Sequence, residues 1–244
     1  MHKKTIFITG SSRGIGKAIA LRFATEGYHV FINCKTSIKE LEAVASQIES
    51  IPNASVSMLI GDVGEASTVK QLAKELYTQC DHLDILINNA GIAYTGLITD
   101  MSDEAWSKIM RTNLDSLFYC SKALLPAMIS RKQGKILNIS SIWGLAGASY
   151  EVAYSTTKSG VNGFTKALAK ELAPSNIQVN ALACGVIDTI MNRNLSSTEA
   201  ASLADDIPLG RFGTPEEVAD MVLNLALAPA YLTGQILTLD GGYL

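Results

Sequence analysis

The chain has 244 residues, 48% of them hydrophobic, and a formal net charge of -3 at pH 7. This length and composition suffice for one α/β domain with a large core, so we expect a single domain over residues 1–244. The balance of charge provides no basic surface for nucleic acid, and no apolar run is long enough for a membrane span or a signal peptide. We therefore expect a cytoplasmic protein that binds neither nucleic acid nor membranes.

Short β-rich apolar runs alternate along the chain with longer segments of helical periodicity. Seven strands are predicted, at residues 5–9, 29–34, 55–60, 83–88, 135–140, 178–184 and 235–239. Six helices are predicted between them, at 17–26, 38–49, 65–79, 103–131, 153–172 and 214–227. This alternation predicts a Rossmann-type, doubly wound parallel seven-stranded sheet with helices on both faces. Residues 186–213 have no clear element, and we expect them to form a substrate lid.

The first predicted strand leads into a glycine-rich turn with glycines at positions 10, 14 and 16. In a doubly wound sheet this turn can present its amide groups to a phosphate, and glycines let the backbone approach closely. The spacing differs from the Gly-x-Gly-x-x-Gly dinucleotide fingerprint, and a turn that only permits tight strand-helix packing is the alternative. Its position at the start of the alternation favours phosphate binding.

The Thr-Gly-x-x-x-Gly-x-Gly motif at residues 9–16 resembles that of the classical short-chain dehydrogenase/reductase family, and the resemblance covers essentially the whole chain. Two further motifs match, Asp62-Val63 after the third strand and Asn88-Asn89-Ala90-Gly91 after the fourth. The family's catalytic tetrad is matched by Asn113, Ser141, Tyr154 and Lys158. The resemblance therefore implies an oxidoreductase with a nicotinamide cofactor.

The cofactor-binding residues that the resemblance implies lie at the ends of several strands. They are Gly10, Ser12, Arg13, Gly14, Ile15, Gly16, Lys35, Thr36, Asp62, Val63, Asn89, Ala90, Gly91, Tyr154, Lys158, Gly185, Ile187 and Thr189. Residues 33–37 lack the carboxylate that usually holds a ribose 2′-hydroxyl. Arg13 and Lys35, with the hydroxyls of Ser12 and Thr36, can surround a 2′-phosphate, so NADP(H) is predicted. The alternative is that both cations are solvated surface residues.

Tyr154 and Lys158 are four residues apart at the start of a predicted helix, so they share one face. A cation near a phenol favours the phenolate and so lowers the phenol's pKa. The resemblance implies that Tyr154 is the general acid, that Lys158 holds the nicotinamide ribose and that Asn113 positions water for a proton relay. It also implies that Ser141 binds the substrate carbonyl oxygen. We assign the substrate to Ser141, Trp143, Glu151 and Tyr154.

The four cysteines and three histidines are scattered without metal-ligand spacing, so no metal site is expected. Cys184 stands where the family often has a proline, and we interpret it as a packing residue with no activated thiolate beside it. Of the two serines that end the fifth strand, Ser140 is the more structural hydroxyl.

Residues 209–218 and 233–242 resemble those of bacterial 3-oxoacyl-acyl-carrier-protein reductases. This predicts NADPH-dependent reduction of a 3-oxoacyl thioester in fatty acid synthesis, with acyl carrier protein as a candidate partner. The loop at residues 173–176 lacks the arginine that often receives the carrier protein in those enzymes. Arg131 and Lys132 are then the nearest cations in the pattern.

Two alternatives remain open. Residues 141–144 with 147–152 resemble reductases that act on a 5-aminopentanone modification of elongation factor P, in which Glu151 would bind the substrate's ammonium. Glu151 is otherwise an exposed loop carboxylate. A non-catalytic NADP-binding sensor or scaffold is the third possibility, and the complete tetrad argues against it.

The predicted helices at 103–131 and 153–172 carry apolar residues on more than one face, which predicts a partner surface. These residues are Leu114, Leu117, Phe118, Val161, Phe164 and Leu168. The family resemblance implies that the partner is another copy of the chain, in a homotetramer.

Overall fold

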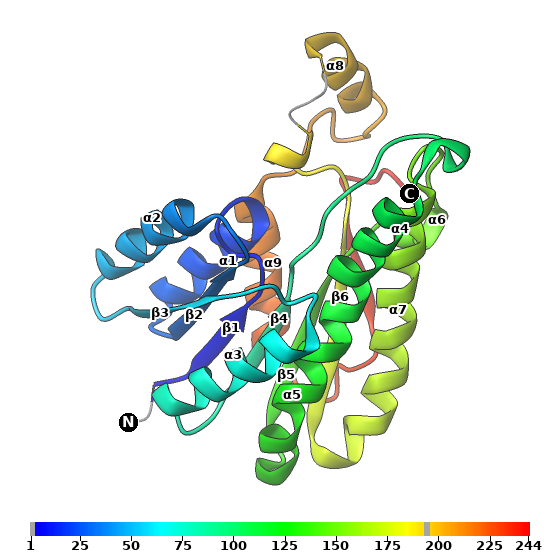
Figure 1. The fold of residues 1–244 in the computed structure, drawn as a ribbon. Helices are drawn as coiled ribbons and strands as arrows, with labels where there is room; N and C mark the ends of the chain where they lie inside the picture. The colour runs from blue at the N-terminus through cyan, green and yellow to red at the C-terminus, as the bar shows by residue number, and fades with distance from the viewer. Residues whose placement is uncertain (1–2, 193–195) are drawn as a thin grey trace.

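The computed structural model describes residues 3–192 and 196–244. Seven parallel strands form one sheet in the order β3-β2-β1-β4-β5-β6-β7 (Figure 1). The strands are β1 Thr5–Ile8, β2 His29–Cys34, β3 Ser55–Ile60, β4 Ile85–Asn88, β5 Gly134–Ser141, β6 Ile177–Cys184 and β7 Ile236–Leu239. The order reverses between β1 and β4, which is where doubly wound sheets bind their ligands. The predicted fold class is confirmed.

Helices cover both faces of the sheet. They are α1 Gly14–Thr25, α2 Ile38–Glu49, α3 Ala66–Gln79, α4 Asp103–Met110, α5 Ser116–Arg131, α6 Trp143–Ala146, α7 Val152–Leu172, α8 Ser197–Asp205 and α9 Pro215–Leu227. Helices α1, α2 and α9 share one hydrophobic cluster with the sheet, and α3, α5 and α7 share the other. The crossovers between parallel strands place helices on both sides, so the sheet is buried on both faces.

The alternation of side chains along β1 illustrates how the two cores form. Ile6 and Ile8 belong to the cluster with α1 and α9, whereas Phe7 between them belongs to the cluster with α3 and α5. All three are at most 3% exposed. Because successive side chains of a strand point to opposite faces, a strand covered on both sides must be apolar at every position.

The single helix predicted at residues 103–131 is wrong in its centre. A π-helical turn, Arg111–Asp115, separates α4 from α5. This turn contains Asn113, which is 3% exposed and whose side chain bonds to the backbone of Ile92. Those bonds compensate for the irregular helical turn, and wide turns of this kind occur often at functional sites. Apolar periodicity alone does not reveal them.

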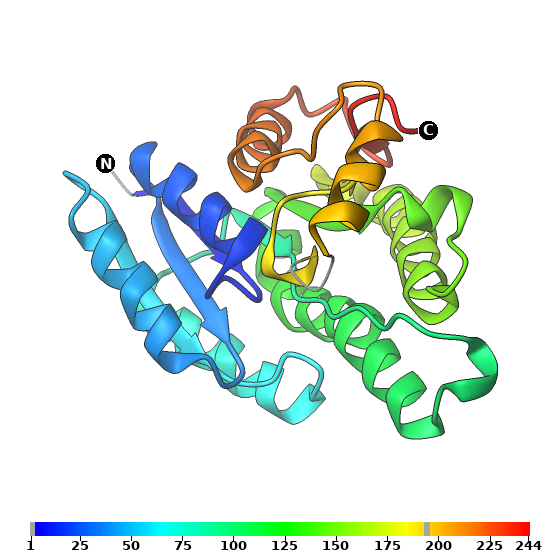
Figure 2. The same cartoon turned by 90° about the horizontal axis from the view of Figure 1, so that it is seen from above.

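The segment at residues 186–213, predicted to lack an element, contains α8. The side chain of Ser196 accepts from the amide of Glu199, and the Glu199 carboxylate accepts from the amide of Ser196. This reciprocal capping box explains why a helix begins here, and its Ser-x-x-Glu signal is readable in the sequence. Figures 1 and 2 show α8 standing beyond the carboxyl edge of the sheet, on the side expected for a lid.

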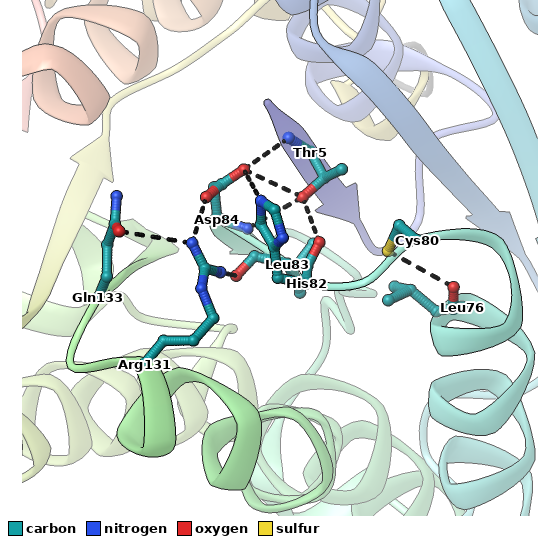
Figure 3. A network of polar contacts seen from close by, with 8 residues as sticks. All are labelled: Thr5, Leu76, Cys80, His82, Leu83, Asp84, Arg131 and Gln133. Atoms are coloured by element: carbon teal, nitrogen blue, oxygen red, sulfur yellow. Dashed lines mark hydrogen bonds and ion pairs between the residues drawn. The ribbon is translucent and has the colours of Figure 1, made fainter. Parts of the chain in front are cut away.

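A polar network ties the opposite, amino edge of the sheet together (Figure 3). The Asp84 carboxylate accepts hydrogen bonds from the amide of Thr5 at 2.9 Å and from the guanidinium of Arg131 at 3.2 Å. Arg131 therefore ends α5 at the edge where β1 and β4 begin. The expectation that Arg131 and Lys132 are the nearest cations for a carrier protein stays a prediction.

Residues 3–192 and 196–244 contain neither a membrane-spanning helix nor a cluster of metal-binding side chains. None of the helices in these ranges is long and apolar enough to cross a membrane. No group of three or more His, Cys, Asp or Glu side chains there is placed to hold a metal ion.

Candidate active site

The glycine loop and the loop after β4 are joined at the switch point of the sheet. The side-chain amide of Asn89 donates to the carbonyl oxygens of Thr9 and Gly10, at 3.0 and 2.9 Å. Gly10 has a φ of +64°, and a Cβ there would lie 2.9 Å from the Cα of Ala90. Only glycine fits this approach, which fixes the two loops against each other. The role of Asn89 in the structure is to position the glycine loop.

The N-terminus of α1 is suited to a phosphate. No side chain caps it, and its first turn contains no acidic residue. A Cβ at Gly16 would lie 2.5 Å from the carbonyl oxygen of Gly10, so the backbone of the loop is packed without side chains. Uncapped amide groups at a helix N-terminus attract anions. The residues present therefore fit a dinucleotide cofactor, whose pyrophosphate the loop from Gly10 to Gly16 would hold.

Two cations lie at the carboxyl ends of β2 and β3. The guanidinium of Arg13 donates to the hydroxyl of Ser37 at 2.6 Å, and the ammonium of Lys35 pairs with Asp62 at 2.6 Å. Burial opposes ionisation of Asp62, but the bonds from Lys35 and from the Gly64 amide outweigh it, so the Asp62 pKa is lowered. The structure thus brings Arg13 and Lys35 to one edge, where Lys35 remains 63% exposed.

The other predicted cofactor residues differ in how much of their surface is exposed to solvent. Val63 and Ile187 are each 5% exposed, so little of either residue's surface is available to a ligand. Ser12 is buried and Thr36 is exposed. The Thr189 methyl lies 3.6 Å from the Cβ position of Gly14, which brings the segment after β6 into contact with the glycine loop.

The predicted catalytic tetrad is gathered where β5 ends and α7 begins. The Lys158 ammonium donates to the carbonyl oxygen of Ile139 at 2.8 Å and lies 5.5 Å from the centre of the Tyr154 ring. The Cβ position of Gly91 is 3.5 Å from Asn113 Oδ1 and 3.7 Å from Lys158 Nζ. The loop after β4 therefore lies against Lys158.

Burial is the largest influence on the pKa values of Tyr154 and Lys158. It raises the pKa of Tyr154, and a hydrogen bond with the Ser141 hydroxyl partly offsets the rise. Burial also lowers the pKa of Lys158 to about 8. The sequence predicted a lowered Tyr154 pKa. The structure differs because the ammonium lies beside the ring and bonds to a backbone carbonyl, so its charge does not outweigh the loss of solvent around the phenol.

Asn113 positions the loop after β4. Its Oδ1 accepts from the Ile92 amide at 2.8 Å, and its Nδ2 donates to the Ile92 carbonyl at 2.8 Å and to the Thr157 hydroxyl at 3.2 Å. The expected role of Asn113 in a proton relay stays a prediction. Thr157 was not among the predicted residues, although a threonine between Tyr154 and Lys158 on a helix beside the site was a readable signal.

Ser140 and Cys184 are structural, as expected. The Ser140 hydroxyl donates to Asn162 Oδ1 at 2.7 Å, which turns it away from the reacting groups. Cys184 pairs with Ser141 across β5 and β6 and is 4% exposed. Burial raises the pKa of the Cys184 thiol to about 12, so the thiol stays protonated near neutral pH.

Two predicted substrate residues flank the tetrad. The amide of Trp143, at the start of α6, donates to the Ser141 hydroxyl oxygen at 3.2 Å. Glu151, at the N-cap of α7, is partly buried, and burial raises the pKa of its carboxyl group. Its charge also raises the Tyr154 pKa, which places the carboxylate within electrostatic reach of the phenol.

The comparisons with known proteins agree with this geometry. A family model described as short chain dehydrogenase matches residues 4–200. The 3-oxoacyl-[acyl-carrier-protein] reductase FabG of Aquifex aeolicus is 42% identical over 99% of this chain and 98% of its own. That of Synechocystis is 42% identical over 96% of this chain and 94% of its own. The crystal structure of YwfH, an NADPH-dependent reductase involved in bacilysin biosynthesis, has a TM-score of 0.93 at 28% identity and covers 100% of this chain and 99% of its own.

A Rossmann-type sheet with a serine, a tyrosine and a lysine gathered beside an open glycine loop defines a nicotinamide-dependent oxidoreductase. The chain belongs to the short-chain dehydrogenase family.

Proposed function

We propose that this protein is an NADPH-dependent ketone reductase whose substrate is a 3-oxoacyl thioester in fatty acid synthesis. The observation that carries the proposal is the convergence of Ser141, Tyr154 and Lys158 at the edge that also holds the glycine loop. The names of the relatives that are 42% identical over nearly the whole chain support the choice of substrate.

The nicotinamide, when bound, supplies the hydride that adds to the carbonyl carbon. The chain's own residues handle the oxygen and the proton. The Ser141 hydroxyl donates to the carbonyl oxygen and the Tyr154 hydroxyl transfers its proton to it, so a ketone becomes a secondary alcohol. With its pKa raised, Tyr154 holds this proton through the neutral range. Lys158 keeps a positive charge near the phenol and stabilises the tyrosinate left behind.

The preference for NADP(H) over NAD(H) is part of the proposal. The side chain of Arg13 reaches Ser37 after β2, and that of Lys35 reaches Asp62 after β3. Residues 33–37 contain no carboxylate to hold a 2′-hydroxyl. The similarity to YwfH, an NADPH-dependent reductase, supports the same choice for this chain.

Two proposals concern partners. Acyl carrier protein is proposed to deliver the substrate, on the strength of the relatives' names.

A homotetramer is proposed because Phe118 and Ile129 on α5 are 45% and 42% exposed. Leu117 and Val161, expected in that surface, are instead in the core at 2% and 1% exposed. Light scattering should give four times the chain mass of 26.0 kDa. The cytoplasmic location stays a prediction.

The test is the initial rate of NADPH oxidation with an acetoacetyl thioester, an amino-ketone and a simple ketone. Each is measured in the unmodified enzyme and in Tyr154→Phe. Thioester turnover that disappears in the variant supports the proposal. The lack of any Tyr154-dependent turnover would instead favour the sensor or scaffold.

One observation favours a second candidate, an amino-ketone substrate. Glu151 is a partly buried carboxylate whose raised pKa reflects burial alone, and no salt bridge to it is found among the described residues. A substrate ammonium would supply the missing cation through a charge-assisted bond. Glu151→Gln should then lower kcat/KM for the amino-ketone about tenfold and leave the thioester unaffected. Equal effects on both substrates would refute this candidate.

A further inference from the structure

The chain's last five residues, Asp240 to Leu244, form a fixed turn beside the active site. The Asp240 carboxylate accepts from the amides of Gly242 and Leu244, at 3.0 and 3.1 Å. The amide of Gly185, in the turn that follows β6, donates to the carbonyl oxygen of Leu239 at 2.9 Å. The C-terminal turn is therefore anchored to the strand end that carries Cys184, and Figure 1 shows the C-terminus beside α6.

The same turn supports the second half of the lid. The amide of Leu209 donates to the carbonyl oxygen of Gly241 at 3.2 Å. Gly241 has a φ of +68°, and a Cβ there would lie 2.8 Å from a methyl carbon of Ile207. The backbone at Leu209 is therefore bonded to the C-terminal turn, and the absence of a side chain at Gly241 leaves room for the side chain of Ile207.

Tyr243 extends from this turn to Trp143. The two rings meet edge to face, with centroids 5.6 Å apart and an angle of 73° between their planes. Both side chains are only partly buried, so both have surface left for a ligand. Trp143 is in turn bonded through its amide to the Ser141 hydroxyl oxygen. A continuous path of contacts thus leads from the serine that binds the carbonyl to Tyr243.

We propose that Trp143 and Tyr243 form an aromatic wall against which the acyl chain of the substrate packs, which makes Tyr243 a specificity-determining residue. The proposal rests on the proposed 3-oxoacyl thioester substrate. Large aromatic side chains bury much apolar surface, so a chain long enough to reach the wall is bound more tightly. An acetoacetyl group carries only one methyl group beyond the reacting carbonyl, so we expect it to end short of Tyr243.

The experiment compares kcat and KM for acetoacetyl and 3-oxooctanoyl thioesters in the unmodified enzyme, Tyr243→Ala and Tyr243→Leu. We expect Tyr243→Ala to raise KM for the eight-carbon substrate about tenfold and to change KM for acetoacetyl less than twofold. Tyr243→Leu, which keeps an apolar side chain, should give an intermediate value. Tyr231→Ala is the matched control, because Tyr231 is a fully exposed tyrosine near the same end of the chain.

A binding readout separates contact with the substrate from a general loss of structure. The chain has two tryptophans, so Trp106→Phe leaves Trp143 as the only one. In that background a 3-hydroxyoctanoyl thioester should change the Trp143 emission, at about tenfold higher concentration when Tyr243 is alanine. If neither thioester is reduced by the unmodified enzyme, the proposed function fails. If both are reduced and Tyr243→Ala changes their KM values equally, or changes neither, the aromatic wall is refuted.

Discussion

The ammonium of Lys158 lies 5.5 Å from the centre of the Tyr154 ring, one helical turn away on α7. Lys158 is buried and Tyr154 is partly buried, and the pKa of each is shifted in the direction that disfavours its charged form. The phenol therefore keeps its proton for transfer. Because the Lys158 pKa is lowered to about 8, the ammonium begins to lose its proton just above neutral pH. Substitutions of Tyr154 and of Lys158 should therefore both affect catalysis.

Removing the Tyr154 hydroxyl should stop turnover and leave the fold intact. Because a positioned general acid contributes roughly 10²–10⁴ to the rate, Tyr154→Phe should lower kcat by at least about 10²-fold. Steady-state NADPH oxidation measures the loss, and thermal unfolding verifies the fold. Tyr150→Phe is the control, since Tyr150 is nearby but 54% exposed. A Tyr154→Phe enzyme with normal kcat would remove this residue from the mechanism.

Replacing Lys158 should abolish turnover and increase the free energy of unfolding at pH 7. The difference between the ordinary pKa of 10.5 and the value of about 8 is worth about 3 kcal/mol. For a lysine whose pKa is lowered by folding, this penalty is complete below about pH 8 and disappears as the pH rises toward 10.5. Lys158→Met should therefore be inactive but more stable at pH 7, by up to about 3 kcal/mol.

Urea unfolding at pH 7 and at pH 10 measures the free energy of unfolding of Lys158→Met and of the unmodified protein. The advantage of Lys158→Met over the unmodified protein should shrink between the two pH values. A variant that is less stable at both would show that the bond from Lys158 to the Ile139 carbonyl outweighs the cost of burying the charge.

The two cations at the ends of β2 and β3 should decide the cofactor preference. Arg13→Ala with Lys35→Ala should raise KM for NADPH by about 10–100-fold and leave KM for NADH nearly unchanged, because only NADPH carries the additional phosphate. Loss of Lys35 also frees the Asp62 carboxylate from its ion pair. Lys39→Ala, at an exposed position on α2, is the control. Equal changes for both cofactors would contradict the assigned role.

The Asp84 network at the amino edge should affect stability without affecting turnover (Figure 3). Asp84→Ala removes the carboxylate that accepts from the Thr5 amide and from the Arg131 guanidinium, which keeps its bonds to the Leu83 carbonyl and the Gln133 side chain. A loss of roughly 2 kcal/mol is expected, which lowers Tm by about 4–8 °C. KM and kcat should stay within twofold, since the reaction takes place at the other edge. Asp81→Ala, at an exposed neighbour, should change neither property.

Much of the fold and of the site was predictable from the order of residues. The strands at 29–34 and 55–60 were predicted with their observed bounds, because short β-rich runs bounded by polar turn residues mark strands in a sequence. Ser141, Tyr154 and Lys158 were identified by the family motifs that they match, and the place of Ser141 at the end of a predicted strand supported its assignment.

The sequence by itself determined the sheet and the edge at which the site lies, because local periodicity and strand direction depend on the chain alone, and its motifs identified the residues that stand there. Only the tertiary structure decided the π-helical turn that buries Asn113, the pairing of Arg131 with Asp84 at the far edge and the contact of Tyr243 with Trp143. It also decided the raised pKa of Tyr154. Each of these depends on contacts between segments distant in sequence and on exclusion of water, and neither is fixed by the spacing of residues along the chain.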